Sequence, residues 1–139
     1  MVYDCYFVIV SHKRFGKVAE GKVSEYNPRS KTWRKLPSLQ MDNTYDEDYD
    51  GPIFCSYGYG TIVCSVDNKI YVLGHWCRKL EMLDLSADNL EWKSLSKSKT
   101  NHDHADVVVI DRKIFAFGGY CNLTVEAYDV DKGKSMFIT

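Results

Sequence analysis

The chain has 139 residues, of which 45% are hydrophobic and 27% charged, and its formal net charge is −1. These values are typical of one soluble globular domain and exclude a chain that is disordered throughout. No apolar run approaches the roughly 20 residues of a membrane-spanning helix, and the net charge gives no general attraction to nucleic acid or anionic lipid. Aromatic residues make up 14%, led by ten Tyr, with only three Pro, a balance that favours β structure.

The first ten residues are apolar, but they lack a basic lead-in and a small-residue cleavage site, and Asp4 interrupts them. We therefore predict a strand here and not a signal peptide. The chain has five Cys and no CxxC pair. An odd number of Cys without a secretory signal indicates reduced thiols, so we expect a cytoplasmic protein, with a nuclear location as the alternative.

In chain order, three short strands are predicted first, over residues 5–10, 23–26 and 32–36. The turn between the last two contains Pro28 in a favoured place. A long connection follows, and then two segments, 61–74 and 105–118, align without a gap at an offset of 44 residues. Each holds an apolar run, a tight polar turn and a second apolar run that ends at Gly, which is typical of a β-hairpin.

The repeat continues beyond each hairpin. Residues 79–85 resemble residues 125–130, and both segments predict an alternating strand with its acidic residue facing outward. A polar turn follows each of them, and then a fourth short apolar run, over 91–95 and 135–138. Each unit therefore predicts four short strands, and the segment upstream of residue 38 is a third copy without a convincing first strand.

This pattern resembles the kelch repeat, which is a four-stranded blade of a β-propeller. The residues that carry the resemblance are Tyr26, Trp33, Gly74, Trp92, Gly118, Gly119 and Tyr128. A glycine pair after a strand permits a sharp turn and a close approach of neighbouring backbone. A Tyr and a Trp on adjacent strands can fill the wedge between blades, each with one polar atom for a backbone partner. All of these residues are expected to be architectural.

The copies depart from the family pattern in several places. Gly74 is followed by His75 where the family has a second glycine, Leu83 stands where it has Tyr, and the last unit has Met136 and Phe137 where a Trp is usual. The resemblance implies an all-β fold, a partial β-propeller of about three four-stranded antiparallel kelch-like blades. The expected division is a partial blade over 2–37, an acidic loop over 38–60, and blades over 61–96 and 105–139.

Closed propellers have about four to eight blades, so about three blades would leave an apolar face uncovered at each end and an open strand edge. Three arrangements answer this problem: a homodimer or other self-association through the end blades, a ring completed by other chains, or a fragment of a longer kelch protein.

Two connections hold candidate partner-binding residues. The first carries five acids and two Tyr within nine residues and has no basic residue between Met41 and Thr61; its candidates are Asp42, Tyr45, Asp46, Glu47, Asp48, Tyr49 and Asp50. In a kelch-like propeller such a loop lines one mouth of the ring, and an acidic, Tyr-rich loop suits a basic peptide; a solvated loop without a partner is the alternative. The second connection carries His102 and His104, which are too few for a metal site.

No catalytic, metal-binding or cofactor residue is predicted, because the chain has no G-x-S-x-G turn, P-loop or GxGxxG motif. The resemblance implies a non-enzymatic scaffold or adaptor that binds a protein partner, related to the substrate receptors of ubiquitin ligases, although no helical BTB-like segment is present. The alternatives are a metal-binding or enzymatic propeller completed by oligomerisation, and a truncated gene fragment without its own activity.

Overall fold

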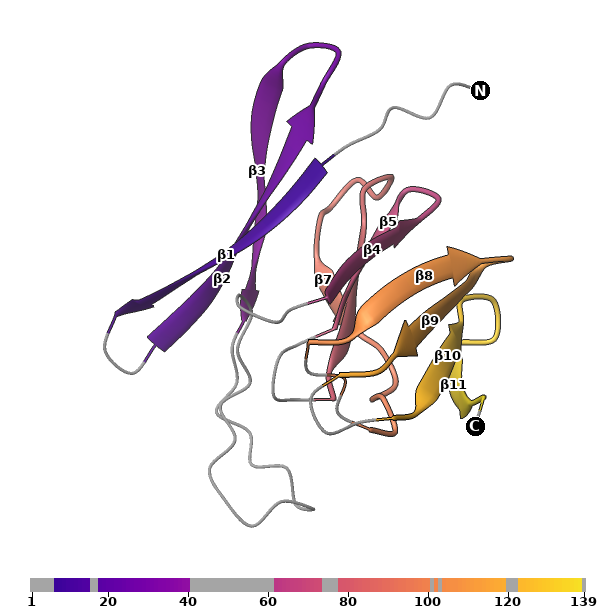
Figure 1. The fold of residues 1–139 in the computed structure, drawn as a ribbon. Coiled ribbons are helices and arrows are strands. Elements are labelled where there is room, and N and C mark those ends of the chain that lie inside the picture. The colour runs from indigo at the N-terminus through magenta and orange to yellow at the C-terminus, as the bar shows by residue number, and fades with distance from the viewer. Residues whose placement is uncertain are drawn as a thin grey trace.

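The computed structural model describes residues 7–15, 18–40, 62–73, 78–100, 102, 104–119 and 123–138. These residues form eleven strands in three antiparallel sheets (Figure 1). The expectation of an all-β chain is confirmed. Over the described ranges there is no helix with the length and apolar character needed to cross a membrane.

The first sheet consists of β1 (Phe7–Phe15), β2 (Val18–Asn27) and β3 (Thr32–Gln40), in that order. Its strands are nine or ten residues long, longer than the segments expected from the apolar runs. Strands β1 and β2 stay in one register along their whole length, and a bulge between Gly21 and Val23 shifts the pairing of β2 with β3. Because the backbone makes the ladder hydrogen bonds, the polar residues in this hairpin do not end the pairing.

The second sheet contains β4 (Ile62–Val66), β5 (Lys69–Leu73), β6 (Leu80–Asp84) and β7 (Trp92–Ser94), and the third contains β8 (Asp106–Ile110), β9 (Lys113–Phe117), β10 (Val125–Asp129) and β11 (Lys134–Phe137). Both sheets are four-stranded meanders in which consecutive strands are neighbours. Their hairpins share one register, since Ile62 pairs with Leu73 as Asp106 pairs with Phe117. The prediction of two four-stranded units is therefore confirmed.

In each sheet, the last residue of the second-to-last strand caps the turn that follows with its side-chain oxygen. The Oδ1 atom of Asn27 accepts hydrogen bonds from the backbone amides of Arg29 and Ser30. Asp84 does the same for the amide of Ser86, and Asp129 does so for two amides in the turn that follows it. Such Asx turns replace backbone bonds that a tight turn cannot make.

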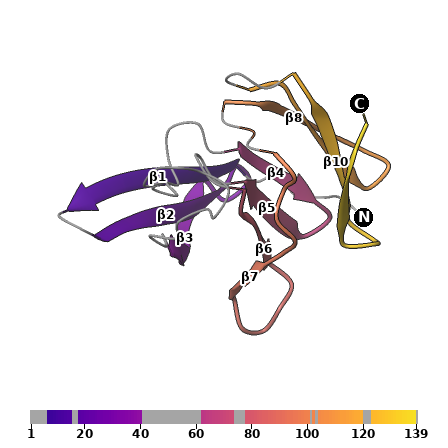
Figure 2. The same ribbon diagram turned by 90° about the horizontal axis from the view of Figure 1, so that it is seen from below.

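The second sheet lies between the other two and buries both of its faces (Figures 1 and 2). One core cluster joins it to the first sheet, with Val23, Leu36 and Leu39 packed against Ile70, Val72 and Leu83. The other cluster joins it to the third sheet, with Ile62, Val66, Tyr71, Leu73 and Leu80 packed against Ile114, Ala116 and Tyr128.

The three sheets stack in the same sense. Leu80, which begins β6, faces the third sheet, and Val23, at the matching place in β2, faces the second. Leu83 of β6 faces the first sheet, and Tyr128, at the matching place in β10, faces the second. In each junction, therefore, the face of one sheet that carries Leu80 or its equivalent packs on the face of the next sheet that carries Leu83 or its equivalent.

Candidate functional site

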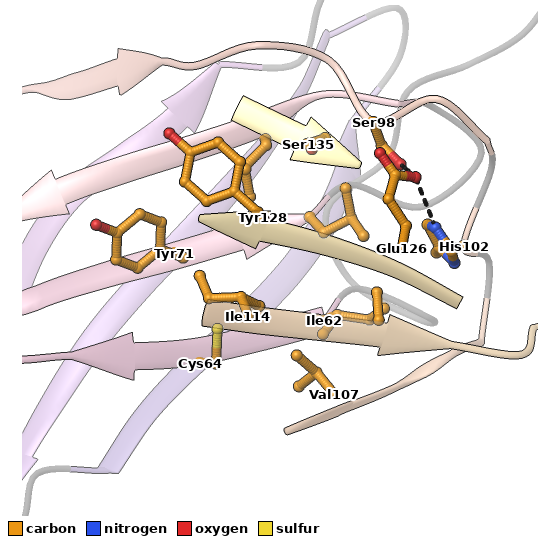
Figure 3. Close-up of a pocket in the computed structure, with 13 residues that line it drawn as sticks. Ile62, Cys64, Tyr71, Ser98, His102, Val107, Ile114, Glu126, Tyr128 and Ser135 are labelled. Atoms are coloured by element: carbon orange, nitrogen blue, oxygen red, sulfur yellow. Dashed lines mark hydrogen bonds and ion pairs between the residues drawn. The ribbon is translucent and has the colours of Figure 1, made fainter. Parts of the chain in front are cut away.

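The junction between the second and third sheets contains a partly open cavity of about 30 Å³, room for about two water molecules. Its walls are mostly apolar, and it has a polar end (Figure 3). The lining residues are Ile62, Cys64, Tyr71, Leu73, Leu80, Ser98, His102, Val107, Ile114, Ala116, Glu126, Tyr128 and Ser135.

This cavity lies where the neighbouring junction has a tryptophan. In β7, Trp92 pairs with Leu83 and packs against the core cluster between the first and second sheets, where its Nε1 donates to the carbonyl oxygen of Pro37 at 2.7 Å. The matching pair in the third sheet is Tyr128 with Ser135. Because a serine stands where the second sheet has an indole, the wedge between the second and third sheets is incompletely filled.

At the polar end, Glu126 is the centre of a hydrogen-bond network. Its Oε2 accepts from the Ser98 hydroxyl at 2.6 Å and lies 2.9 Å from His102 Nε2, while its Oε1 accepts from the backbone amide of Lys99 at 2.7 Å. The Thr100 amide approaches Oε2 at 3.4 Å. These donors belong to the connection between β7 and β8, so one carboxylate of β10 organises most of that connection.

Burial by itself would raise the pKa of Glu126. The hydrogen bonds from His102, Ser98 and the two amides outweigh burial and lower the pKa from 4.5 to about 2. The carboxylate is therefore ionised at neutral pH inside the protein, only 3% exposed. The sequence pattern predicted that the acidic residues at this place face outward. That prediction is wrong for Glu126 and for Glu81, both buried, because each lies on the face of its strand that packs on a neighbouring sheet, the face shared with Tyr128 and with Leu83.

His102 is buried, with an exposed fraction of 1%, and its Nε2 also contacts the Thr100 hydroxyl at 3.1 Å. Its Nδ1 has no hydrogen-bond partner among the described residues. His102, one of the candidate partner-binding residues, therefore lies in the β7–β8 connection with its side chain inside the junction. His104 is exposed, with φ of 57°, in the turn before β8, so the two His do not form one site.

Ser98, His102 and Glu126 are the residue types of a hydrolase triad, but their order is wrong for catalysis. A catalytic histidine lies between the serine and the acid, where it takes the hydroxyl proton. Here the carboxylate lies in the middle and binds both partners. The described residues also contain no group of three or more His, Cys, Asp or Glu placed to hold a metal ion.

The apolar end of the cavity contains two tyrosines, Tyr71 of β5 and Tyr128 of β10, whose ring centroids are 6.2 Å apart. Their hydroxyls point away from the Glu126–His102 pair (Figure 3). Burial raises the pKa of Tyr71 to about 12, with Tyr128 as the next cause. Burial likewise raises the pKa of the Cys64 thiol to about 12, so this thiol is protonated and a poor nucleophile.

A single guanidinium joins three turns at the outside of the same junction. Arg112, in the β8–β9 turn, forms ion pairs with Asp67 in the β4–β5 turn and with Asp131 in the β10–β11 turn, the latter at 3.0 Å. Asp111 and Arg112 both have positive φ, 47° and 59°, as a two-residue type I′ turn requires.

The predicted architectural residues that the structure describes lie at sheet junctions or strand ends. Trp92 packs between the first and second sheets and donates to a backbone carbonyl. The rings of Tyr26 and Trp33 lie against each other in a tilted arrangement with centroids 4.9 Å apart, on the face of the first sheet that is turned away from the second. Gly118 and Gly119, after β9, have positive φ values of 73° and 116°. Gly74 and the acidic residues 42–50 lie outside the described residues.

A comparison with models of known protein families found no match for this chain. A search of curated proteins also found no match.

Proposed function

We propose that this chain is a segment of a kelch-like β-propeller that serves as a non-enzymatic protein-interaction module. The observation that carries the proposal is the repeated junction. Antiparallel meanders of the same strand order pack face to face in the same sense, with a Trp wedge between two of them. Radial repetition of such sheets is the principle of a propeller.

The chemistry of the cavity between the second and third sheets favours a binding role for the protein surface over catalysis inside the cavity. The cavity has room for about two water molecules, its carboxylate accepts hydrogen bonds from several donors, and its thiol is protonated. A substrate therefore has no reactive group to meet there. The long connections between sheets are the remaining places for function, as is common when a rigid scaffold positions variable loops.

The acidic segment 42–50 is the proposed contact for a partner with a basic, Lys- or Arg-rich surface. It belongs to the connection from β3 to β4, which corresponds to the connection from β7 to β8 that Glu126 organises. Five carboxylates within nine residues attract cations at long range, and two Tyr supply contact area at low entropic cost.

The test is affinity capture followed by reconstitution with the purified partner. In the test variant, the five acids of 42–50 are replaced by Asn or Gln; in the control, Asp88 and Glu91, both exposed, are neutralised instead. We expect the first variant to bind at least tenfold more weakly and to lose the salt dependence of binding. Equal affinity of both variants would refute the acidic contact, and failure to reconstitute any complex would refute the interaction module.

A further inference from the structure

We infer that the chain assembles head to tail with a second copy of itself, the third sheet of one copy packing against the first sheet of the next. This goes beyond the proposed function, because it requires no other protein. In the existing junction, one face of the second sheet is covered by the third sheet. The third sheet has an equivalent face that no described sheet covers, and the inference rests on the equivalence of these two faces.

Among the described residues, no sheet packs on the other face of the third sheet, and this face is apolar between charged residues at the strand ends, which are Asp106, Lys113, Asp129 and Lys134. Strand β8 turns Val107 and Val109 toward the second sheet and leaves Val108 and Ile110 exposed. Register places further exposed apolar side chains on the same face, one on β9, one on β11 and one just beyond it. They are Phe117, Met136 and Ile138.

Each of these side chains has a counterpart that is already packed in a junction. Ile110 corresponds to Val66 and Phe117 to Leu73. Both counterparts pack against the third sheet and have exposed fractions below 9%. Ile138 donates its amide to the carbonyl of Val125, as Leu95 does to that of Leu80, and Leu95 also packs in the core. The exposed fractions of Ile110, Phe117 and Ile138 are 53%, 40% and 43%. The third sheet therefore presents a face of the kind that binds the next sheet.

The face of the first sheet that is turned away from the second is the other half of the proposed contact, and it carries Tyr26 and Trp33 with Ser24 and Lys35 as the next pair on that face. Trp33 pairs with Tyr26 in the first sheet just as Trp92 pairs with Leu83 in the second. Trp92 uses its indole to fill the wedge against β3, but Trp33 is 57% exposed and has no sheet beside it among the described residues. A second copy that places its third sheet here would receive Trp33 beside the end of β11. Exposed aromatic side chains of this size are frequent anchors of interfaces.

The occupant is a second copy because the two uncovered faces belong to opposite kinds. The free face of the third sheet is equivalent to the face of the second sheet that carries Leu80 and packs on the third sheet. The free face of the first sheet is equivalent to the face of the second sheet that carries Leu83 and packs on the first sheet. Two like faces do not meet in either existing junction. The contact is therefore heterologous, and it closes into a ring if the rotation between copies permits.

The experiment measures the mass of the purified chain by sedimentation velocity. We expect the wild-type chain to have at least twice the mass of one chain. One variant blocks the third sheet with Ile110→Asp and Phe117→Asp, a second blocks the first sheet with Trp33→Asp, and Leu123→Asp is the control because Leu123 is exposed and belongs to no strand.

Each blocked variant alone should have the mass of one chain, and Leu123→Asp should keep the wild-type mass. An equimolar mixture of the two blocked variants should form a one-to-one dimer, because each retains the face that the other lacks. Restored assembly in the mixture also demonstrates that both variants fold. A monomeric wild type, assembly of Trp33→Asp alone, or a mixture that stays monomeric would each overturn the inference.

Discussion

Replacement of Glu126 by Gln should cost about 3 kcal/mol of unfolding free energy at pH 7. The change keeps the side-chain shape but places an amide NH₂ group where Oε2 now accepts from Ser98 and His102. Hydrogen bonds to a charged group contribute roughly 1.5–3 kcal/mol each, and a buried donor left without an acceptor adds a penalty. The same hydrogen bonds lower the pKa from 4.5 to about 2, which corresponds to a stabilisation of about 3 kcal/mol.

The pH dependence of the unfolding free energy tests the role of Glu126 in a second way. A lowered pKa stabilises the folded state fully above the unfolded value of 4.5, and the contribution is lost as pH falls through about 2. The difference between wild type and Glu126→Gln should therefore be constant above pH 6 and shrink to a few tenths of a kcal/mol at about pH 2.

Urea unfolding followed by Trp fluorescence measures both effects. The matched control is Glu91→Gln, since Glu91 is an exposed glutamate, and we expect it to change stability by less than about 0.5 kcal/mol. If Glu126→Gln cost less than about 1 kcal/mol, or if its cost did not change between pH 6 and pH 2, the role given to this carboxylate would be refuted.

Three further predictions concern the cavity, the backbone and the thiol. Ser135→Leu should partly fill the wedge and raise the unfolding free energy by about 1 kcal/mol; a lower urea midpoint would contradict this. Gly118→Ala should cost about 1 kcal/mol, because space for a Cβ is open but φ is 73°, whereas Lys31→Gly, at φ of 56°, should not destabilise in the same urea assay; equal losses would refute the backbone explanation. Cys64 should react with iodoacetamide at pH 8 roughly a thousandfold more slowly in the folded protein than in urea, since its pKa rises from 9.0 to about 12; peptide mass spectrometry showing equal rates would contradict this.

The strands of the second and third sheets were predictable because their local signals agree. The alternation in 62–73 and 106–117, and the polar turns at Asp67 and Asp111, reflect local backbone preferences that a single sequence records. The length of the first hairpin was not predictable in this way, because pairing through its polar residues depends on the backbone ladder.

The candidate site was harder to predict because it depends on contacts between distant segments. Glu126 and His102 are 24 positions apart, and neither has a local sequence context that indicates a buried pair. The available signal was the repetition of Glu81 at the matching place in β6, beside the donor-rich run that begins at Ser98. A solvent-facing carboxylate seldom recurs at the same strand position for no structural reason.

Within a single copy, the described part of the second sheet packs on both of its faces while the first and third sheets each pack on one, so in the unassembled chain local opening should proceed from the outside inward. In a one-dimensional stack, each module gains most of its stability from its nearest neighbours. Amide hydrogen exchange should therefore be slowest in β5 and β6 and faster in β2 and β10, so the ends of the stack govern how readily the molecule exposes its interior.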